Sequence, residues 1–394
     1  MMQISPETQL FIREHSSDDV RVLALQAKKY PDIDMPTAIT QIAGRKVAAE
    51  KIPSWWEIEK IWYPKHLSLE QCSSEITARY KARLLQGDSL TDLTGGFDCS
   101  FLATGFKSAT YVERQEELCE IAAHNFPVLN LNHINIKNED GVTYLQAMSP
   151  VDCLFLDPAR RNEHGGKTVA ISDCEPNVAE LEELLLQKAN RVMIKLSPML
   201  DLSLALKELK QTQEVHILSV NNECKELLIL LGQTSPTEIS IHCVNLSTKG
   251  TQEEQHFVFT REQEQCSECT YTDSLETYLY EPNASLLKAG AFRSIAAAYP
   301  VRKLHPNSHL YTSDTFIENF PGRIFRIVNQ CSFNKKEVKE NLADLKKANV
   351  TVRNFPATVA ELRKRIHLAE GGDTYLFAST LNNGQKVLIR CEKV

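Results

Sequence analysis

The segment Asp92-Leu-Thr-Gly-Gly-Phe-Asp98 decides the fold of this 394-residue chain. A short apolar stretch, residues 90–93, runs into it as a strand, and residues 99–104 can begin a helix behind it. The two glycines let the backbone turn tightly and approach a ligand closely. A helix N-terminus behind such a turn favours a carboxylate or a phosphate. The segment therefore predicts a ligand-binding turn between a strand and a helix.

Strand and helix patterns alternate outward from this turn. Expected strands cover residues 90–93, 109–112, 131–136, 151–156, 191–196 and 215–220, and expected helices cover 73–86, 99–104, 116–125, 178–189 and 202–210. This alternation predicts an α/β fold, a Rossmann-like and mostly parallel sheet with helices on both faces. Ligands of such sheets bind beyond the carboxyl ends of the strands, so the residues that follow each strand are the informative ones.

Acidic residues follow three of these expected strands. Glu113 ends the second strand, and an acid about 20 residues after the first loop can accept hydrogen bonds from two ribose hydroxyls. The third strand is followed by Asn138-Glu139-Asp140-Gly141, whose polar groups suit an adenine edge. The fourth ends in Asp157-Pro158-Ala159-Arg160-Arg161. A nicotinamide site would favour G-x-G-x-x-G where this loop reads GGFDCS, and the chain has no P-loop.

The motifs DLTGGFD, YVERQ and LFLDPARR, in this order, resemble class I S-adenosylmethionine-dependent methyltransferases over residues 70–230. In that family the first loop holds the methionine part of the cofactor, the acid after the second strand holds the ribose, and residues after the third strand contact adenine. The resemblance implies S-adenosylmethionine as the cofactor and a binding set of Asp92, Thr94, Gly95, Gly96, Phe97, Asp98, Glu113 and Asp140. It also implies catalytic roles for Asp157, Pro158 and Arg160 at the strand end that faces the substrate.

The chain departs from the family pattern at two places. Asp98 stands where many members have another glycine, and Ala159-Arg160 replaces the Pro-aromatic pair that sandwiches a planar amine. The Asp-Pro-Ala-Arg segment is itself similar to that of RNA 5-methyluridine methyltransferases. Those enzymes need a cysteine nucleophile after the fifth strand, and residues 195–200 read KLSPML. Transfer to a nitrogen or an oxygen is therefore favoured over carbon 5, with a base nitrogen as the expected acceptor. Asp157 is the candidate to accept a proton or orient an amine.

The C-terminal part carries a second resemblance. Residues 319–394, with NFPATVAELRKRIHLAEGGDTYLFAST and KVLIRCEK, resemble the THUMP-like domain of bacterial methyltransferases, and residues 270–318 resemble the ferredoxin-like segment that precedes it. Residues 1–66 are expected to form a helical region and 67–250 the methyltransferase domain. The pattern of the last region predicts a small α+β unit with helices at 334–348 and 357–372, the second ended by two glycines.

Charge divides unevenly along the chain. Residues 280–394 hold 18 Lys+Arg and 10 Asp+Glu, whereas residues 1–279 hold 26 and 41. A basic module beside an acidic one favours a phosphate-bearing partner. The resemblance to THUMP-like domains implies that this partner is structured RNA, tRNA or rRNA. Two domains with different surfaces would give the same balance. The alternatives are a methyltransferase of small molecules or proteins, with the C-terminal part as a scaffold, and a non-catalytic RNA-binding protein with a methyltransferase fold.

The sequence gives little evidence for other partners or sites. The sequence predicts no DNA partner, no membrane segment and no secretory signal, and it carries no signal about oligomerisation. Eleven cysteines without a framework spacing fit a reducing cytoplasm. Cys266-Ser-Glu-Cys269, with His242 and His256 upstream, forms half of a zinc pattern that nothing completes, so no metal site is predicted.

Overall fold

The computed structural model describes residues 4–65, 72–160, 170–234, 236–248 and 254–394. The chain forms two compact units. Met1–Gln213 together with Leu228–Pro236 makes the first, and Glu214–Leu227 together with Thr237–Val394 makes the second. The boundaries of the four regions expected from the sequence stay predictions.

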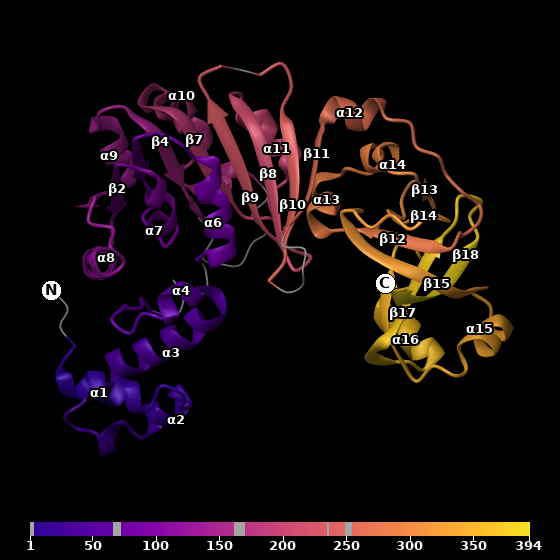
Figure 1. Ribbon diagram of the computed structural model, residues 1–394, viewed down its shortest axis with the longest axis horizontal. Helices are drawn as coiled ribbons and strands as arrows, with labels where there is room; N and C mark the ends of the chain where they lie inside the picture. Colours follow the sequence, from indigo (N-terminus) through magenta and orange to yellow (C-terminus); the bar gives the residue numbers. More distant parts are fainter. Residues whose placement is uncertain (1–3, 66–71, 161–169, 235, 249–253) are drawn as a thin grey trace. The chain divides into compact units, whose positions relative to one another are not determined.

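The N-terminal region is helical, as expected (Figure 1). Prolines lie in the first turns of three of its helices, where the missing backbone N–H breaks no helical hydrogen bond. The carboxylate of Asp34 caps the longest helix by accepting from the Thr37 N–H. Phe11, Leu23 and Ile42 form a small buried core between the helices. These helices are α1 (Pro6–Glu14), α2 (Val20–Leu25), α3 (Met35–Lys51) and α4 (Pro53–Trp56).

The sheet of the first unit places its switch point between two central strands. Its order is β9-β7-β4-β1-β2-β3, and β1 pairs in parallel with both β2 and β4. The chain moves outward to one side from β1 and to the other side from β4, so a crevice opens at their carboxyl ends. The strands are β1 (Ser89–Asp92), β2 (Ser108–Glu113), β3 (Ile134–Asn138), β4 (Val151–Leu156), β7 (Ala189–Leu196) and the end of β9 (Glu223–Gly232), beside a small pair, β5 (Ala159–Arg160) and β6 (Cys174–Glu175).

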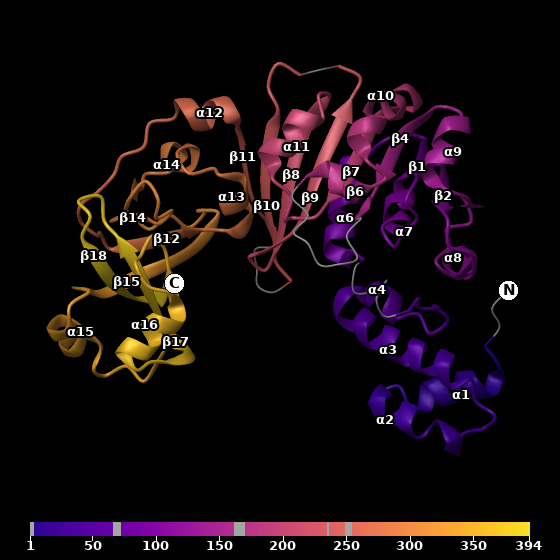
Figure 2. The same ribbon diagram turned by 180° about the vertical axis from the view of Figure 1, so that it is seen from behind.

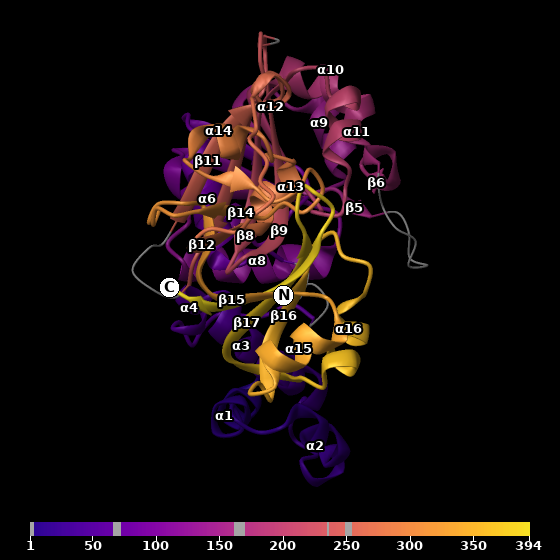
Figure 3. The same cartoon turned by 90° about the vertical axis from the view of Figure 1, so that its right-hand side faces the viewer.

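Helices cover both faces of these strands. Figures 1 and 3 show α6 on one face and α10 and α11 on the other. The α/β class expected from the sequence is confirmed, although α9 was not predicted. Asp140 caps α9 by accepting from the Val142 and Thr143 N–H groups. The helices are α6 (Glu75–Leu84), α7 (Cys99–Leu102), α8 (Glu116–Val128), α9 (Gly141–Ala147), α10 (Val178–Lys188) and α11 (Leu202–Glu208).

The second unit contains its own strands in the order β11-β10-β8-β9. β10 runs parallel to β8 and antiparallel to β11, which forms the edge. The edge strand was expected in the polar stretch after residue 250, whereas β9 and β10 were not predicted. The strands new to this unit are β8 (Thr212–Val220), β10 (Ser240–Leu246) and β11 (Glu254–Thr260).

The C-terminal sheet has the order β13-β14-β12-β15-β18-β17-β16. Figure 2 labels five of these strands, β14, β12, β15, β18 and β17. Side chains alternate across it. Leu376 and Ala378 pack toward the helices α15 and α16, while Phe377 faces the opposite core. The elements after β11 are α12 (Arg261–Cys266), β12 (Tyr278–Pro282), α13 (Ala284–Ala289), α14 (Ser294–Ala298), β13 (Arg302–Lys303), β14 (Tyr311–Ser313), β15 (Gly322–Ser332), α15 (Lys335–Leu342), β16 (Lys347–Val352), α16 (Val359–Ile366), β17 (Ala369–Thr380) and β18 (Lys386–Lys393).

The expected ends of the two C-terminal helices were wrong. α16 ends at Ile366, because His367 takes a left-handed conformation and its N–H bonds the Arg363 carbonyl. Gly371 and Gly372 lie instead in an irregular part of β17, at φ values of +97° and +84°. The first helix ends at Leu342, because the residues after it pair as β16. Within the described ranges, no helix combines the length and hydropathy needed to cross a bilayer.

Candidate active site

The turn after β1 is tied to the end of β4 by one side chain. Asp92 is completely buried, and its Oδ1 accepts hydrogen bonds from the Thr94 N–H at 3.1 Å and the Thr94 hydroxyl at 3.2 Å. The same Thr94 hydroxyl oxygen accepts from the Asp157 N–H at 2.8 Å. Thr94 therefore fixes the glycine turn against the strand end that carries the candidate catalytic acid.

The two glycines of the turn have different surroundings. Gly95 has φ +46°, and a Cβ there would lie 2.5 Å from the Glu113 Cβ and 2.8 Å from the Val112 carbonyl oxygen. Only glycine fits that close approach and that conformation. A Cβ on Gly96 would meet no heavy atom within 4 Å. Gly95 thus lets the turn press against β2, and Gly96 leaves open space above the turn.

The helix behind the turn is shorter than expected. α7 spans Cys99–Leu102, one turn, and continues as a 3-10 turn through Gly105. The macrodipole of a single turn is small, because it sums few aligned peptide units. A ligand at this turn would therefore meet an open backbone and acidic side chains rather than a strong helix dipole.

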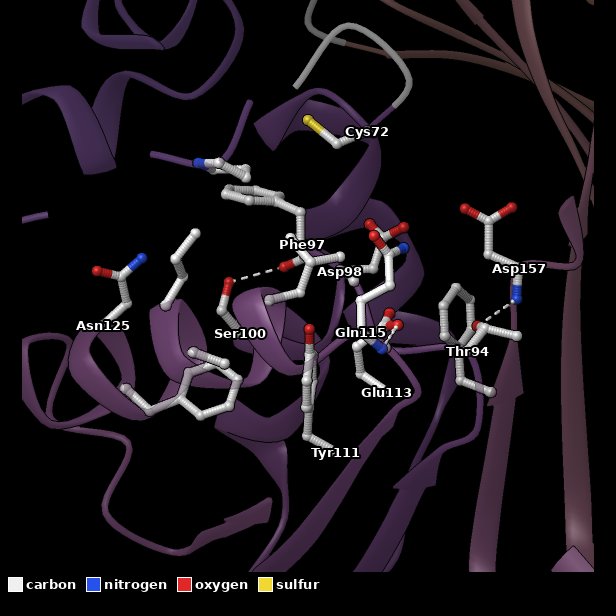
Figure 4. Close-up of a pocket in the computed structure, with 18 of the residues that line it drawn as sticks. Cys72, Thr94, Phe97, Asp98, Ser100, Tyr111, Glu113, Gln115, Asn125 and Asp157 are labelled. Carbon is white, nitrogen blue, oxygen red and sulfur yellow. Dashed lines mark hydrogen bonds between the residues drawn. The ribbon is translucent and has the colours of Figure 1, made fainter. Parts of the chain in front are cut away.

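Glu113 stands at the centre of the site (Figure 4). It ends β2 with 6% of its surface exposed, and its Oε1 accepts from the Gln115 N–H at 2.7 Å. Burial raises the pKa of Glu113, which the Gln115 hydrogen bond partly offsets.

Two adjoining cavities meet at Glu113. The first, of ≈ 250 Å³, extends over the glycine turn toward Trp55 and Cys72. The second, of ≈ 390 Å³, extends past Asp140 toward β5 and β6. The residues that line both are Thr94, Glu113, Gln115 and Asp157. An elongated ligand could therefore cross the ends of β1, β2 and β4 with one part in each cavity.

A buried cluster of opposite charges lies beside the turn. Lys81 of α6 has no exposed surface, and its Nζ lies 3.2 Å from Oδ1 of Asp98. The Ser73 hydroxyl donates to Oδ2 of Asp98 at 2.8 Å. Lys195, at the end of β7, pairs with Oδ2 of Asp157 and lies 3.8 Å from Oδ2 of Asp98. Two lysines therefore balance the acids that converge here.

Burial shifts the pKa of two further acids. The pKa of Asp92 rises to about 8, chiefly by desolvation, with the charges of Asp98 and Asp157 adding to the rise. Its Oδ2 is buried without a hydrogen-bond partner. Desolvation also raises the pKa of Asp157, and the Lys195 ammonium group opposes that rise, although 41% of the Asp157 side chain still meets solvent through the cavity.

The N-terminal region supplies an aromatic wall. Phe97 packs against Trp55 of α4, with ring centroids 4.2 Å apart, and against Phe101 at 5.4 Å. Trp55 is buried and lines the first cavity beside Cys72. Nothing in the sequence marks Trp55 or Cys72 as site residues, because they come from a region with no strand-end position.

The structure brings most of the predicted site residues together. The first cavity is lined by Thr94, Gly95, Gly96, Phe97, Asp98, Glu113 and Asp157, with Asp92 buried beneath them, while Asp140 lines only the second. Pro158 is buried behind Asp157, and the side chain of Arg160 lies outside the described residues. Lys81 was missed, although it follows Thr77 and Ala78 at helical spacing and so shares their buried face.

The strand order, the switch point between β1 and β4, and the acids at the strand ends define the class I methyltransferase fold. The chain is 33% identical to a protein of Porphyromonas gingivalis W83 assigned as a methyltransferase, over 100% of both chains and with a TM-score of 0.87. Residues 278–321 match the ferredoxin-like domain family, and 322–393 match the THUMP domain-like family. The chain therefore belongs to the bacterial family of methyltransferase-fold proteins with a THUMP-like domain.

More distant structures align with part of the chain. An O-methyltransferase from Bacillus cereus in complex with S-adenosylhomocysteine is 13% identical, over 49% of this chain and 98% of that one, with a TM-score of 0.33. An rRNA methylase from Streptococcus thermophilus is 14% identical, over 40% and 93%, with a TM-score of 0.29. No curated protein matches the sequence.

Proposed function

We propose that this protein is an S-adenosylmethionine-dependent methyltransferase that modifies a base nitrogen in structured RNA, tRNA or rRNA. One observation carries the proposal: the glycine turn, Glu113 and Asp157 converge on two adjoining cavities at the switch point, with Asp92, the last residue of β1, buried beneath them. Of the alternatives, a non-catalytic role is disfavoured by this intact set.

The residues present fit this cofactor at three points. Glu113, between the two cavities, suits the ribose hydroxyls, because a carboxylate accepts two hydrogen bonds at once. The unpartnered Oδ2 of Asp92 lies below the turn and would accept from the amino group of the methionine part. Asp140, in the second cavity, faces the space suited to adenine. The open space at Gly96 leaves the backbone accessible.

Asp157 is the group of this chain best placed to act on the substrate. When bound, S-adenosylmethionine supplies a methyl group on a positively charged sulfur. Asp157 is held by the Thr94 hydroxyl at its N–H and by Lys195 at one carboxylate oxygen. Its carboxylate would accept a hydrogen bond from the substrate amine, aim the nitrogen lone pair and receive the proton after transfer.

Covalent attack by a cysteine is disfavoured. Cys72 lines the first cavity, but desolvation raises the pKa of its thiol to about 11. A thiol in this state is almost wholly protonated at neutral pH and is a weak nucleophile. Together with the absence of cysteine in residues 195–200, this favours a nitrogen acceptor over pyrimidine carbon 5.

The RNA substrate is supported by the C-terminal region. Its charge balance is basic, with 18 Lys+Arg against 10 Asp+Glu in residues 280–394, and it matches the THUMP domain-like family. Lys364 and Arg365 are exposed on α16. Cations on such a surface attract phosphates and release counterions, so RNA affinity should fall steeply with salt.

Calorimetry with S-adenosylmethionine and S-adenosylhomocysteine tests the cofactor assignment. We expect one site per chain, with binding strongly reduced in Glu113→Ala. Glu117→Ala is the matched control, because Glu117 is exposed and pairs with Lys65 at the surface. Absence of binding by the wild type, or equal binding by Glu113→Ala, would contradict the assignment.

Labelled methyl transfer tests the substrate. RNA from a strain that lacks this protein should accept more label than RNA from the parent strain, and Asp157→Asn should abolish the transfer. The label should lie on a base nitrogen after digestion to nucleosides. If metabolite or protein extracts take the label and this RNA does not, the RNA assignment is wrong, whereas the cofactor assignment stands on the calorimetry.

A further inference from the structure

Three neighbouring strands of the second unit gather four potential metal ligands. Glu214 and His216 lie on β8, two residues apart and so on one face. His242 on β10 is directly opposite His216 in the parallel ladder, and His256 comes from the edge strand β11. Figure 2 shows β8, β10 and β11 side by side. Ligand atoms of Glu214, His216 and His242 all lie within 4.8 Å of one another.

The separations within this cluster match those of ligands on one metal ion. His242 Nδ1 lies 3.1 Å from His256 Nε2, and His216 Nε2 lies 3.2 Å from Glu214 Oε2. Two nitrogen ligands at the usual zinc distance and tetrahedral angle are roughly 3.3 Å apart. The His216 and His242 rings stack with centroids 4.3 Å apart. Side-chain rotations would bring the ligand atoms of Glu214, His216 and His242 around one centre. His256, which contacts His242, would supply the fourth ligand from the edge strand.

The Ser240 hydroxyl orients His242 so that Nδ1 can bind a metal ion. The other ring nitrogen, Nε2, lies 3.1 Å from the Ser240 hydroxyl. A metal-bound histidine normally donates its second N–H to such a partner, which fixes the tautomer and the ring orientation.

We propose that Glu214, His216, His242 and His256 form a site for a borderline divalent cation, with Zn²⁺ as the fitting ion. Three imidazoles and one carboxylate suit this ion and would complete a tetrahedral set. The site joins the edge strand β11 to β10 and β8, so its role is to stabilise this part of the fold. The proposal is independent of the methyltransferase chemistry.

This site differs from the half-pattern visible in the sequence. His242 and His256 do come together, but their partners are on β8 and not in the Cys266–Cys269 segment. Cys269 lies near Tyr271 and Lys303 instead. Strand register, and not local spacing, brings these ligands together, which explains why no motif predicts them and why the sequence favoured no metal.

Metal titration of the full-length chain without an affinity tag tests the proposal. After treatment with a chelator, we expect calorimetry to give one equivalent of Zn²⁺, and Co²⁺ to develop the intense visible bands of tetrahedral coordination. Zn²⁺ should also raise the melting temperature. Ser240→Ala should weaken binding about tenfold, because it removes the hydrogen bond between the Ser240 hydroxyl and His242 Nε2. His242→Gln should weaken binding further. His305→Gln is the matched control, because it removes a histidine elsewhere in the same unit.

Variants of the proposed metal-binding residues decide whether this site exists. His256 is exposed on the edge strand, so His256→Gln should fold normally. It therefore tests the site even if the substitution of a buried ligand, as in His216→Gln, prevents folding. Loss of the Co²⁺ bands in His256→Gln but not in His305→Gln supports the site. The proposal is overturned if the wild type binds no equivalent of Zn²⁺, or if His242→Gln and His256→Gln both bind as the wild type does.

Discussion

The ammonium group of Lys195 pairs with Oδ2 of Asp157 where two neighbouring parallel strands, β7 and β4, reach their carboxyl ends. The same ammonium lies 3.8 Å from Oδ2 of Asp98, at the end of the glycine turn. Lys195 thus connects the candidate substrate-facing acid to the candidate cofactor turn. It positions Asp157 and lowers the pKa of that carboxyl relative to burial alone.

Lys195→Met should shift the pH dependence of methyl transfer. Without the ammonium group, desolvation raises the pKa of Asp157 further, so the acid limb of the rate profile moves to higher pH. The measurement is the rate with saturating substrates across pH. Lys107→Met, at a surface pair with Asp88, should leave the profile in place. An unshifted profile in Lys195→Met would show that Lys195 does not act through Asp157.

Lys81→Met should destabilise the protein strongly. Its Nζ is buried against Oδ1 of Asp98, so its removal leaves a buried carboxylate with the Ser73 hydroxyl and the more distant Lys195 ammonium group in place of a close ion pair. Breaking a buried pair in this way typically costs about 3–5 kcal/mol. Lys107→Met removes a pair whose side chains are 79% and 69% exposed, and such pairs contribute about 0–1 kcal/mol. Denaturant unfolding measures both variants, and equal losses would contradict the role given to Lys81.

The fold was largely predictable because strand and helix periodicities are local. β4 was expected at residues 151–156 and spans Val151–Leu156. A short apolar run that ends at Asp157-Pro158 is typical of a buried strand. The glycine turn, Glu113 and Asp157 were placed correctly at strand ends by the same logic. β9 was missed because the turn that separates it from β8 consists of Asn221 and Asn222 at positive φ, without the glycine that usually marks such a hairpin turn.

The rest depends on contacts between distant parts of the chain. Lys81 and Lys195 lie 114 positions apart in sequence numbering, and only packing of α6 against the strand ends brings both to Asp98. Gly371 and Gly372 look like a helix stop, yet His367 ends α16 first because it adopts a left-handed conformation. The sequence pattern alone did not show whether α16 ends at His367 or at the two glycines. The pairing of β17 with β16, which includes residues 369 and 370, places the end at His367.

Gly95→Ala should impair both folding stability and cofactor binding. The new Cβ would lie 2.5 Å from the Glu113 Cβ, and residue 95 would keep φ +46°, so the turn must move away from β2. A strained left-handed residue alone costs about 1–3 kcal/mol. Gly96→Ala is the matched control, because its Cβ meets no heavy atom within 4 Å. Thermal melting should separate the two, and equal melting temperatures would contradict the close approach.

The stability of the ligand-free protein should fall as pH rises from about 4 to about 8. Asp92 has a pKa of about 8 in the folded chain against 3.8 ordinarily. In this window the folded state therefore holds a proton that the unfolded state has released, and the linkage slope is negative, up to about 1.4 kcal/mol per pH unit. Glu113 and Asp157, whose pKa values are also raised, act in the same direction.

Asp92→Asn isolates the contribution of this one carboxyl. The amide keeps the shape and cannot ionise, so the loss of stability between about pH 5 and pH 8 should become clearly shallower than in the wild type. Urea unfolding at several pH values measures the slope. Asp152→Asn is the comparison, because hydrogen bonds from Asp88 and Ser89 lower the pKa of Asp152 and its ionisation is complete below this window. If the free energy of unfolding changes with pH at the same slope in Asp92→Asn and in the wild type, Asp92 is not the carboxyl group that stays protonated in the folded state.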